Sequence, residues 1–168
     1  MSLSIYQAAF PYVLRTLNAL SDILDKAAAH CEARKIDPAQ MLAYRLAPDM
    51  FDLKRQVQIV TDQAKGMAAR LGGVEIPSYA DDETSIADLK ARIAKTVDFL
   101  GSISEAQVAG SEDRQVSVKT RAGELTFSGR DYLFGFMLPN FYFHAATAYG
   151  ILRHAGVELG KSDFLARK

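Results

Sequence analysis

The chain of 168 residues contains one cysteine, no tryptophan and no excess of either charge. Because Cys31 is alone, an internal disulfide and a cysteine-rich zinc site are both excluded. Lysine and arginine number 20, and aspartate and glutamate also number 20. Nucleic-acid binders usually show a basic excess, which this chain lacks. We therefore expect no nucleic-acid partner.

Long apolar runs are also missing. No stretch approaches the roughly 18 consecutive apolar residues of a membrane-spanning helix. The N-terminal residues 1–6 lack the basic and apolar regions of a signal peptide. These absences predict a cytoplasmic protein without a membrane partner. The length suits a single domain that covers residues 1–168.

Apolar residues recur at alternating steps of three and four residues in four segments, which is typical of helices with one buried face. The segments are 3–31, 46–71, 86–103 and 133–151. Within the first, Pro11 predicts a kink or a helix that begins near Phe10. Its last apolar position is Cys31, which we expect to be a small buried residue rather than a reactive thiol. Together the segments predict an all-α four-helix bundle.

One segment has a different period. Within residues 114–128, apolar residues alternate with polar ones on either side of a turn signal at 121–123. A period of two around a glycine predicts a β-hairpin between the third and fourth helices. An isolated hairpin is only marginally stable in water, so we expect it to pack on the bundle.

A few polar residues fall where the helices should be apolar. Asn140, His144 and Thr147 lie on the predicted inner face of the fourth helix, and Asp49 lies on that of the second. A buried polar group is costly unless it is hydrogen-bonded or ligates something. An imidazole from one helix and a carboxylate from another are a plausible part of a metal site.

The same residues also have structural interpretations. His144 can be a hydrogen-bonded core residue, and Asp49 can cap a helix that begins after Pro48. Asn140 can bond backbone groups that Pro139 leaves free. The other two histidines, His30 and His154, are expected to be exposed.

Several motifs point to a known family. They are LPNFYFH at 138–144, YRLAPDM at 44–50, the segment 156–165 and residues 4–6. Through them the chain resembles a bacterial family of unknown function within the DinB/YfiT-like superfamily of metalloenzymes. The resemblance implies an up-down-down-up four-helix bundle. It also implies a divalent metal held by three histidines, one from the second helix and two from the fourth at H-x-x-x-H spacing.

The resemblance assigns possible ligands residue by residue. His144 matches the second helix-four ligand, Asn140 stands in the place of the first, and Asp49 is the nearest candidate on helix two. The implied metal is zinc or nickel, although two of the three typical histidines are absent. Both metals favour imidazole, and amide ligation of them is weak.

Three functions are consistent with these residues. The first is a structural or interaction protein that forms a homodimer, as balanced charge favours. The second is a binder of a small apolar or aromatic ligand beside His144, because the fourth helix is rich in aromatics. The alternative is a divalent-metal enzyme of thiol-transferase or hydrolase type with an altered site at Asp49, Asn140 and His144.

Overall fold

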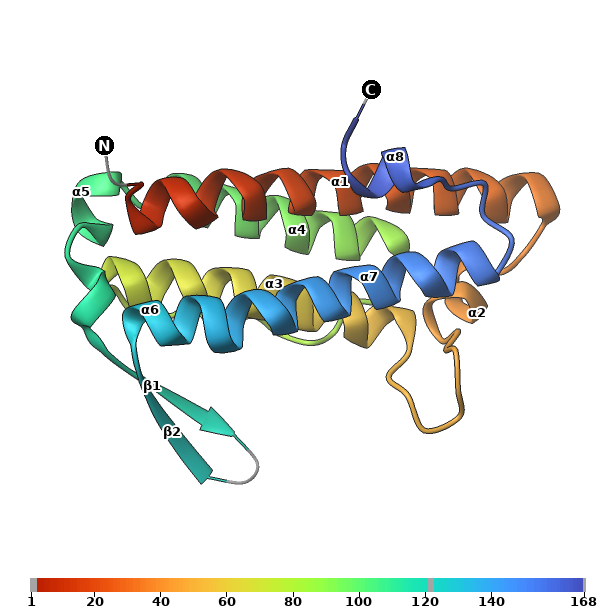
Figure 1. The fold of residues 1–168 in the computed structure, drawn as a ribbon. Helices are drawn as coiled ribbons and strands as arrows, with labels where there is room; N and C mark the ends of the chain where they lie inside the picture. The colour runs from red at the N-terminus through yellow and green to blue at the C-terminus, as the bar shows by residue number, and fades with distance from the viewer. Residues whose placement is uncertain (1–2, 121–122, 168) are drawn as a thin grey trace.

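Four long helices form the body of the protein in a computed structural model that describes residues 3–120 and 123–167 (Figure 1). They are α1 (Ile5–Arg34), α3 (Leu53–Gly72), α4 (Ile86–Gly101) and α7 (Leu138–His154). Helix α3 packs against α7 and α4, and α1 packs against α4 and α7. Because α3 and α4 run opposite to α1 and α7, the bundle has the predicted up-down-down-up order. In the described part of the chain, none of the helices has the length and apolar character needed to cross a membrane.

Shorter elements connect the long helices. They are α2 (Pro38–Leu42), α5 (Glu105–Val108), η1 (Ser111–Asp113), β1 (Gln115–Thr120), β2 (Gly123–Ser128), α6 (Gly129–Asp131), η2 (Tyr132–Met137) and α8 (Lys161–Phe164). The strands pair antiparallel as the predicted hairpin, with Val118 opposite Leu125. Only β1 buries side chains, those of Val116 and Val118, whereas Leu125 of β2 is exposed. Part of the predicted turn, residues 121–122, lies outside the described residues.

The predicted apolar faces make the core, with a correction at the start of α1. Cys31 is buried, as expected, with 1% of its surface exposed. The helix begins at Ile5 rather than near Phe10. Its N-cap is Ser4, whose hydroxyl accepts a hydrogen bond from the amide of Gln7 at 3.1 Å. This cap supports a start that places Pro11 inside the helix.

The second long helix begins later than the apolar pattern predicts. Helix α3 starts at Leu53, and the carboxylate of Asp52 accepts a hydrogen bond from the amide of Arg55 at 2.8 Å. Asp49 lies four residues before Leu53, exposed in a turn. The prediction that Asp49 occupies the inner face of this helix is therefore wrong, and so is its role as the cap. Asp52 provides the cap instead.

The fourth helix is preceded by a π-helical turn, η2. A π turn hydrogen-bonds five residues along the chain rather than four, so it shifts the face that later residues present. The buried face of α7 consequently runs through Phe141, Ala145 and Ala148. Asn140, His144 and Thr147 are each displaced to its edge and only half-buried, rather than facing the core as predicted.

Candidate functional site

His144 meets a side chain from the neighbouring helix at the edge of the α3–α7 contact. Its Nδ1 lies 2.7 Å from Oε1 of Gln56, which belongs to α3 and is 2% exposed. The amide nitrogen of Gln56 donates to the backbone carbonyl of Phe51 at 3.1 Å. One short hydrogen-bond chain therefore runs from the carbonyl of Phe51 through the amide of Gln56 to the imidazole of His144.

This chain fixes the tautomer of the imidazole. Because Nε2 of Gln56 is used on Phe51, its Oε1 faces His144 and can only accept. The proton of a neutral His144 must then be on Nδ1, which leaves a lone pair on Nε2. Among the described residues, no group is hydrogen-bonded to that Nε2. His144 thus offers one oriented acceptor that the described part of the chain does not use.

The surroundings also keep the imidazole neutral. Burial lowers the pKa of His144 below its ordinary value, and the positive charge of Arg55 lowers it further. Both effects disfavour the imidazolium form. At neutral pH the free Nε2 is therefore a lone-pair acceptor rather than a donor.

The other predicted site residues make contacts of their own. The amide nitrogen of Asn140 donates to the carbonyl of Phe136 at 2.6 Å, and the hydroxyl of Thr147 donates to that of Phe143 at 2.7 Å. Asn140 thus bonds the backbone, as its structural interpretation expected, but the acceptor is the carbonyl of Phe136 and not that of residue 135, which the missing N–H of Pro139 would leave free in an α-helix. Asp49 lies in the exposed turn before α3.

A zinc or nickel ion would need more donors than this site presents. Across residues 3–120 and 123–167, no three His, Cys, Asp or Glu side chains gather as a metal site would require. Gln56, which meets His144 from the second long helix, directs its oxygen to the imidazole proton. The donors therefore do not fit the implied metal, because a single imidazole beside amides is a poor ligand set for zinc or nickel. The set Asp49, Asn140 and His144 stays a prediction.

An aromatic ring contacts His144, and a pocket includes residues that interact with the His144–Gln56 pair. The ring of Phe143 stands edge-on to His144 with 5.1 Å between centroids, and it is 59% exposed. Phe51, whose carbonyl ends the hydrogen-bond chain, is also exposed. A pocket of about 380 Å³ is lined by Phe51 and Arg55 together with Arg45, Asp52, Lys54, Gln58 and Asp81. Phe51, which accepts a hydrogen bond from Gln56, and Arg55, whose charge lowers the pKa of His144, thus both line this pocket.

A second polar cluster, which the sequence analysis missed, centres on Arg92 of α4. Its guanidinium donates to Oγ1 of Thr61 at 2.7 Å, to Oδ1 of Asp62 at 2.8 Å, to Oε1 of Glu83 at 2.8 Å and to the carbonyl of Ala80 at 2.9 Å. Arg92 is nearly fully buried. The cluster ties α3, the 73–85 connection and α4 together.

Further contacts complete this cluster. The amide of Gln58 donates to Oε2 of Glu83 at 2.7 Å. Burial alone would raise the pKa of Glu83, but the hydrogen bonds from Gln58 and Arg92 hold it below its ordinary value. Above the ring of Tyr79 lie the ammonium groups of Lys65 and Lys95, at 4.0 and 4.4 Å from its centroid. The sequence contained a sign that Arg92 is buried, because Arg92 lies three residues after Leu89 and therefore on the same apolar helix face.

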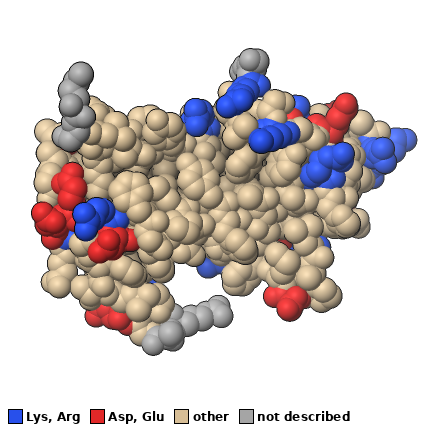
Figure 2. Space-filling view, viewed as in Figure 1, with Lys and Arg blue, Asp and Glu red and all other residues tan. Residues whose placement is uncertain are grey.

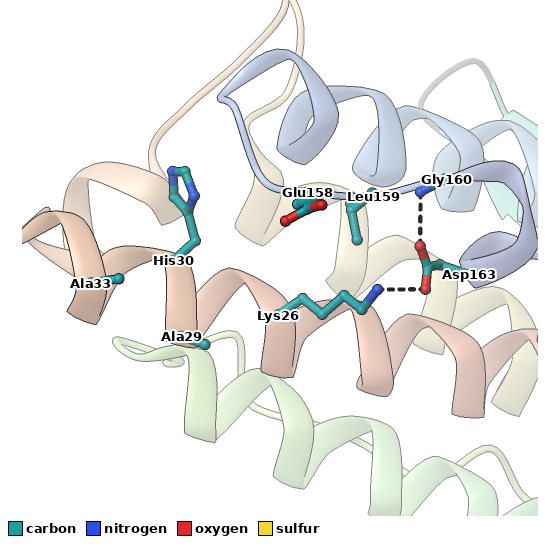
Figure 3. A pocket seen from close by; sticks show the side chains of 8 residues that line it. All are labelled: Lys26, Ala29, His30, Ala33, Glu158, Leu159, Gly160 and Asp163. Atoms are coloured by element: carbon teal, nitrogen blue, oxygen red, sulfur yellow. Dashed lines mark hydrogen bonds and ion pairs between the residues drawn. The ribbon is translucent and has the colours of Figure 1, made fainter.

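A separate pocket of about 820 Å³ lies between α1 and the segment 158–163 (Figure 3). Lys26 crosses it to Asp163, with 2.7 Å between Nζ and Oδ1. His30 lines the same pocket and is half-buried, so the prediction that it is exposed is wrong, whereas His154 is exposed as predicted. Within the described part of the chain, the buried Nε2 of His30 has no hydrogen-bond partner. Such an atom marks a place for a water molecule or a polar ligand group.

A solved structure of a related protein has the same fold as this chain. A crystal structure of a DinB family member protein from Shewanella denitrificans is 42% identical to the chain, with a TM-score of 0.89. The match covers 96% of this chain and 91% of that one. No curated protein shows significant similarity to the chain.

A family model for a domain of unknown function, DUF1993, matches residues 5–165. That span includes all four long helices and the hairpin. It also includes the hydrogen-bonded pair of Gln56 and His144. The chain therefore belongs to the DUF1993 family, within the DinB-like superfamily that its motifs resemble.

Proposed function

We propose that the protein binds a small molecule at the surface beside His144, with Nε2 of His144 accepting a hydrogen bond from it. The observation that supports this most directly is the chain from the Phe51 carbonyl through Gln56 to Nδ1 of His144. It orients the imidazole and fixes its tautomer, yet leaves Nε2 unused. An acceptor held in place before its partner arrives loses little conformational freedom on binding.

The neighbouring groups favour a ligand with an aromatic or apolar body. Phe143 and Phe51 both expose ring surface beside the hydrogen-bond chain. In the pocket that Phe51 lines, Arg55 is paired with Asp81 at 2.7 Å, and Arg45 with Asp52 at 3.5 Å. Most of the pocket's charge is therefore neutralised internally. A neutral molecule with one O–H or N–H donor fits this combination best.

The test uses phenol and toluene as probes, because the two differ only in that a methyl group in toluene takes the place of the hydroxyl group of phenol. Each is titrated into protein labelled with ¹⁵N at histidine, and the ring nitrogens are followed by NMR. We expect phenol to shift the Nε2 resonance of His144. We also expect phenol to bind at least ~10-fold more tightly than toluene, because one hydrogen bond contributes about 1.4 kcal/mol, which corresponds to a factor of ten in affinity.

Two variants make the experiment specific. His144→Phe keeps an aromatic ring but removes the acceptor, so phenol should lose its advantage over toluene. His154→Phe makes the same exchange at an exposed position of α7 and should leave phenol binding unchanged. Equal binding of the two probes to the wild type, or undiminished phenol binding by His144→Phe, would overturn the proposal.

A further inference from the structure

The pocket between α1 and the segment 158–163 is built from residues that the His144 site does not use (Figure 3). Its volume of about 820 Å³ falls in the range of small-molecule sites. The lining residues are Lys26, Ala29, His30 and Ala33 of α1, with Glu158, Leu159, Gly160 and Asp163 from the end of the chain. The last four belong to the segment 156–165, one of the motifs through which the chain resembles its family. Binding at His144 gives this segment no role.

The C-terminal wall of the pocket is held firmly against the bundle. The carboxylate of Asp163 accepts hydrogen bonds from Nζ of Lys26 and from the amide of Gly160, both at 2.7 Å and one at each oxygen. The ring of Phe164 meets that of Tyr149 of α7 edge-on, with 5.8 Å between centroids. This wall is therefore in place before a ligand arrives, which lowers the entropic cost of binding.

The charges that line the pocket do not cancel. Charged side chains of both signs gather at the end of the molecule where α8 and the end of α1 lie (Figure 2). Lys26 neutralises Asp163 through their ion pair. Glu158 is exposed, and no residue that the structure describes is hydrogen-bonded or ion-paired with its carboxylate. Figure 3 shows this carboxylate directed toward the side of the cavity where His30 lies. One unpaired carboxylate charge remains, and it favours a cation over an anion.

His30 adds an acceptor that is not in use. Its Nε2 is buried and lacks a hydrogen-bond partner within the described residues. A buried N–H without an acceptor is rarer than a buried acceptor without a donor, so we assign the lone pair to this nitrogen. The χ2 torsion of histidine is broad, and a small turn of the ring can bring Nε2 to the cavity. A ligand group that donates a hydrogen bond would satisfy it.

We propose that this pocket binds an aliphatic primary amine in its ammonium form. The ammonium group has a positive charge and three N–H donors, so it can pair with Glu158 and donate to Nε2 of His30. The alkyl part of the ligand lies on the apolar side chains of Ala29, Ala33 and Leu159. A zinc ion fits less well, because no three His, Cys, Asp or Glu side chains of the described residues gather around one point.

Butylamine, 1-butanol and pentanoate test the proposal, because each joins a butyl chain to a different head group: ammonium, hydroxyl or carboxylate. Each is titrated into the full chain at neutral pH and followed by NMR through the backbone amides of Leu159 and Gly160. We expect butylammonium to bind at least ~5-fold more tightly than 1-butanol, a ratio typical of one partly exposed ion pair. Pentanoate should bind more weakly than both. Butylammonium should also shift the ring ¹⁵N resonances of His30.

Two variants assign the preference to one carboxylate. Glu158→Gln keeps the size of the side chain and removes its charge, so butylammonium should lose its advantage over 1-butanol. Glu124→Gln makes the same exchange at an exposed position of the hairpin, outside the pocket, and should retain the advantage. Equal binding of butylammonium and 1-butanol, tighter binding of pentanoate, unmoved resonances of His30, or an undiminished preference in Glu158→Gln would each overturn the proposal.

Discussion

Arg92 and His144 are both polar groups within a largely apolar bundle, but they differ in how completely they are satisfied. The guanidinium of Arg92 donates to four acceptors from two other segments. The imidazole of His144 uses one nitrogen on Gln56, and no residue that the structure describes is hydrogen-bonded to the other. With four of its five N–H groups bonded to the protein, Arg92 holds elements together and has little bonding capacity left for a ligand. A half-paired group that is firmly oriented retains that capacity.

Removing Arg92 should have the largest effect on stability. Arg92→Ala leaves the carboxylate of Glu83, which is 7% exposed, without its charge partner. We expect a loss of about 3–5 kcal/mol in the free energy of unfolding, measured by urea denaturation. The control is Arg130→Ala, whose side chain is 71% exposed, and its change should stay within ~0.5 kcal/mol. Equal small changes in the two variants would contradict a structural role for the Arg92 cluster.

Gln56→Leu should have an intermediate effect. It removes the acceptor of the Nδ1 proton at a buried position, so we expect a loss of about 1–3 kcal/mol. The ¹⁵N shifts of His144 should change as well, because Gln56 no longer fixes the tautomer. Gln7→Leu, at an exposed position of α1, should change neither quantity. If the ¹⁵N shifts of Gln56→Leu match those of the wild type, Gln56 does not orient the ring.

The smallest effect concerns pH. The pKa of His144 is lowered from 6.5 in the folded protein, so below pH 6.5 the unfolded chain binds the proton more readily. The stability contribution is complete above 6.5 and is lost as the pH falls below it. Unfolding free energies measured across this window should therefore decline toward acid, and less steeply in His144→Phe. Glu83 acts separately, because its pKa is lowered from 4.5. An identical pH dependence in wild type and variant would show that His144 does not titrate in this window.

Much of the fold was predictable because burial follows the helical period. The positions of the predicted apolar period in α3, such as Leu53, Val57 and Leu71, are buried, and the helix ends at its C-cap Gly73, which adopts the left-handed conformation. The start of the helix was not predictable from the same pattern. Leu46 and Asp49 continue the period by chance, and only the cap formed by Asp52 distinguishes helix from loop.

The candidate site was only partly predictable. The pattern singled out His144, but the π turn before α7 shifts the helix face and so places the imidazole at the edge of the core. Its partner is Gln56. Nothing in the sequence distinguishes Gln56 from the other glutamines, because its contact with His144 exists only once α3 and α7 are packed together. Arg92 was overlooked for a different reason. Charged residues are almost never fully buried unless they are paired, so arginine is assigned to the outside by default.

Cys31 gives the protein an internal reporter of its own opening. Burial raises the pKa of its thiol, and the negative charge of Asp37 raises it further, so the folded protein presents little thiolate to an alkylating reagent. Because the chain has no other cysteine, the rate of modification measures how often the end of α1 is released from the bundle. Every variant described above contains this reporter without further engineering.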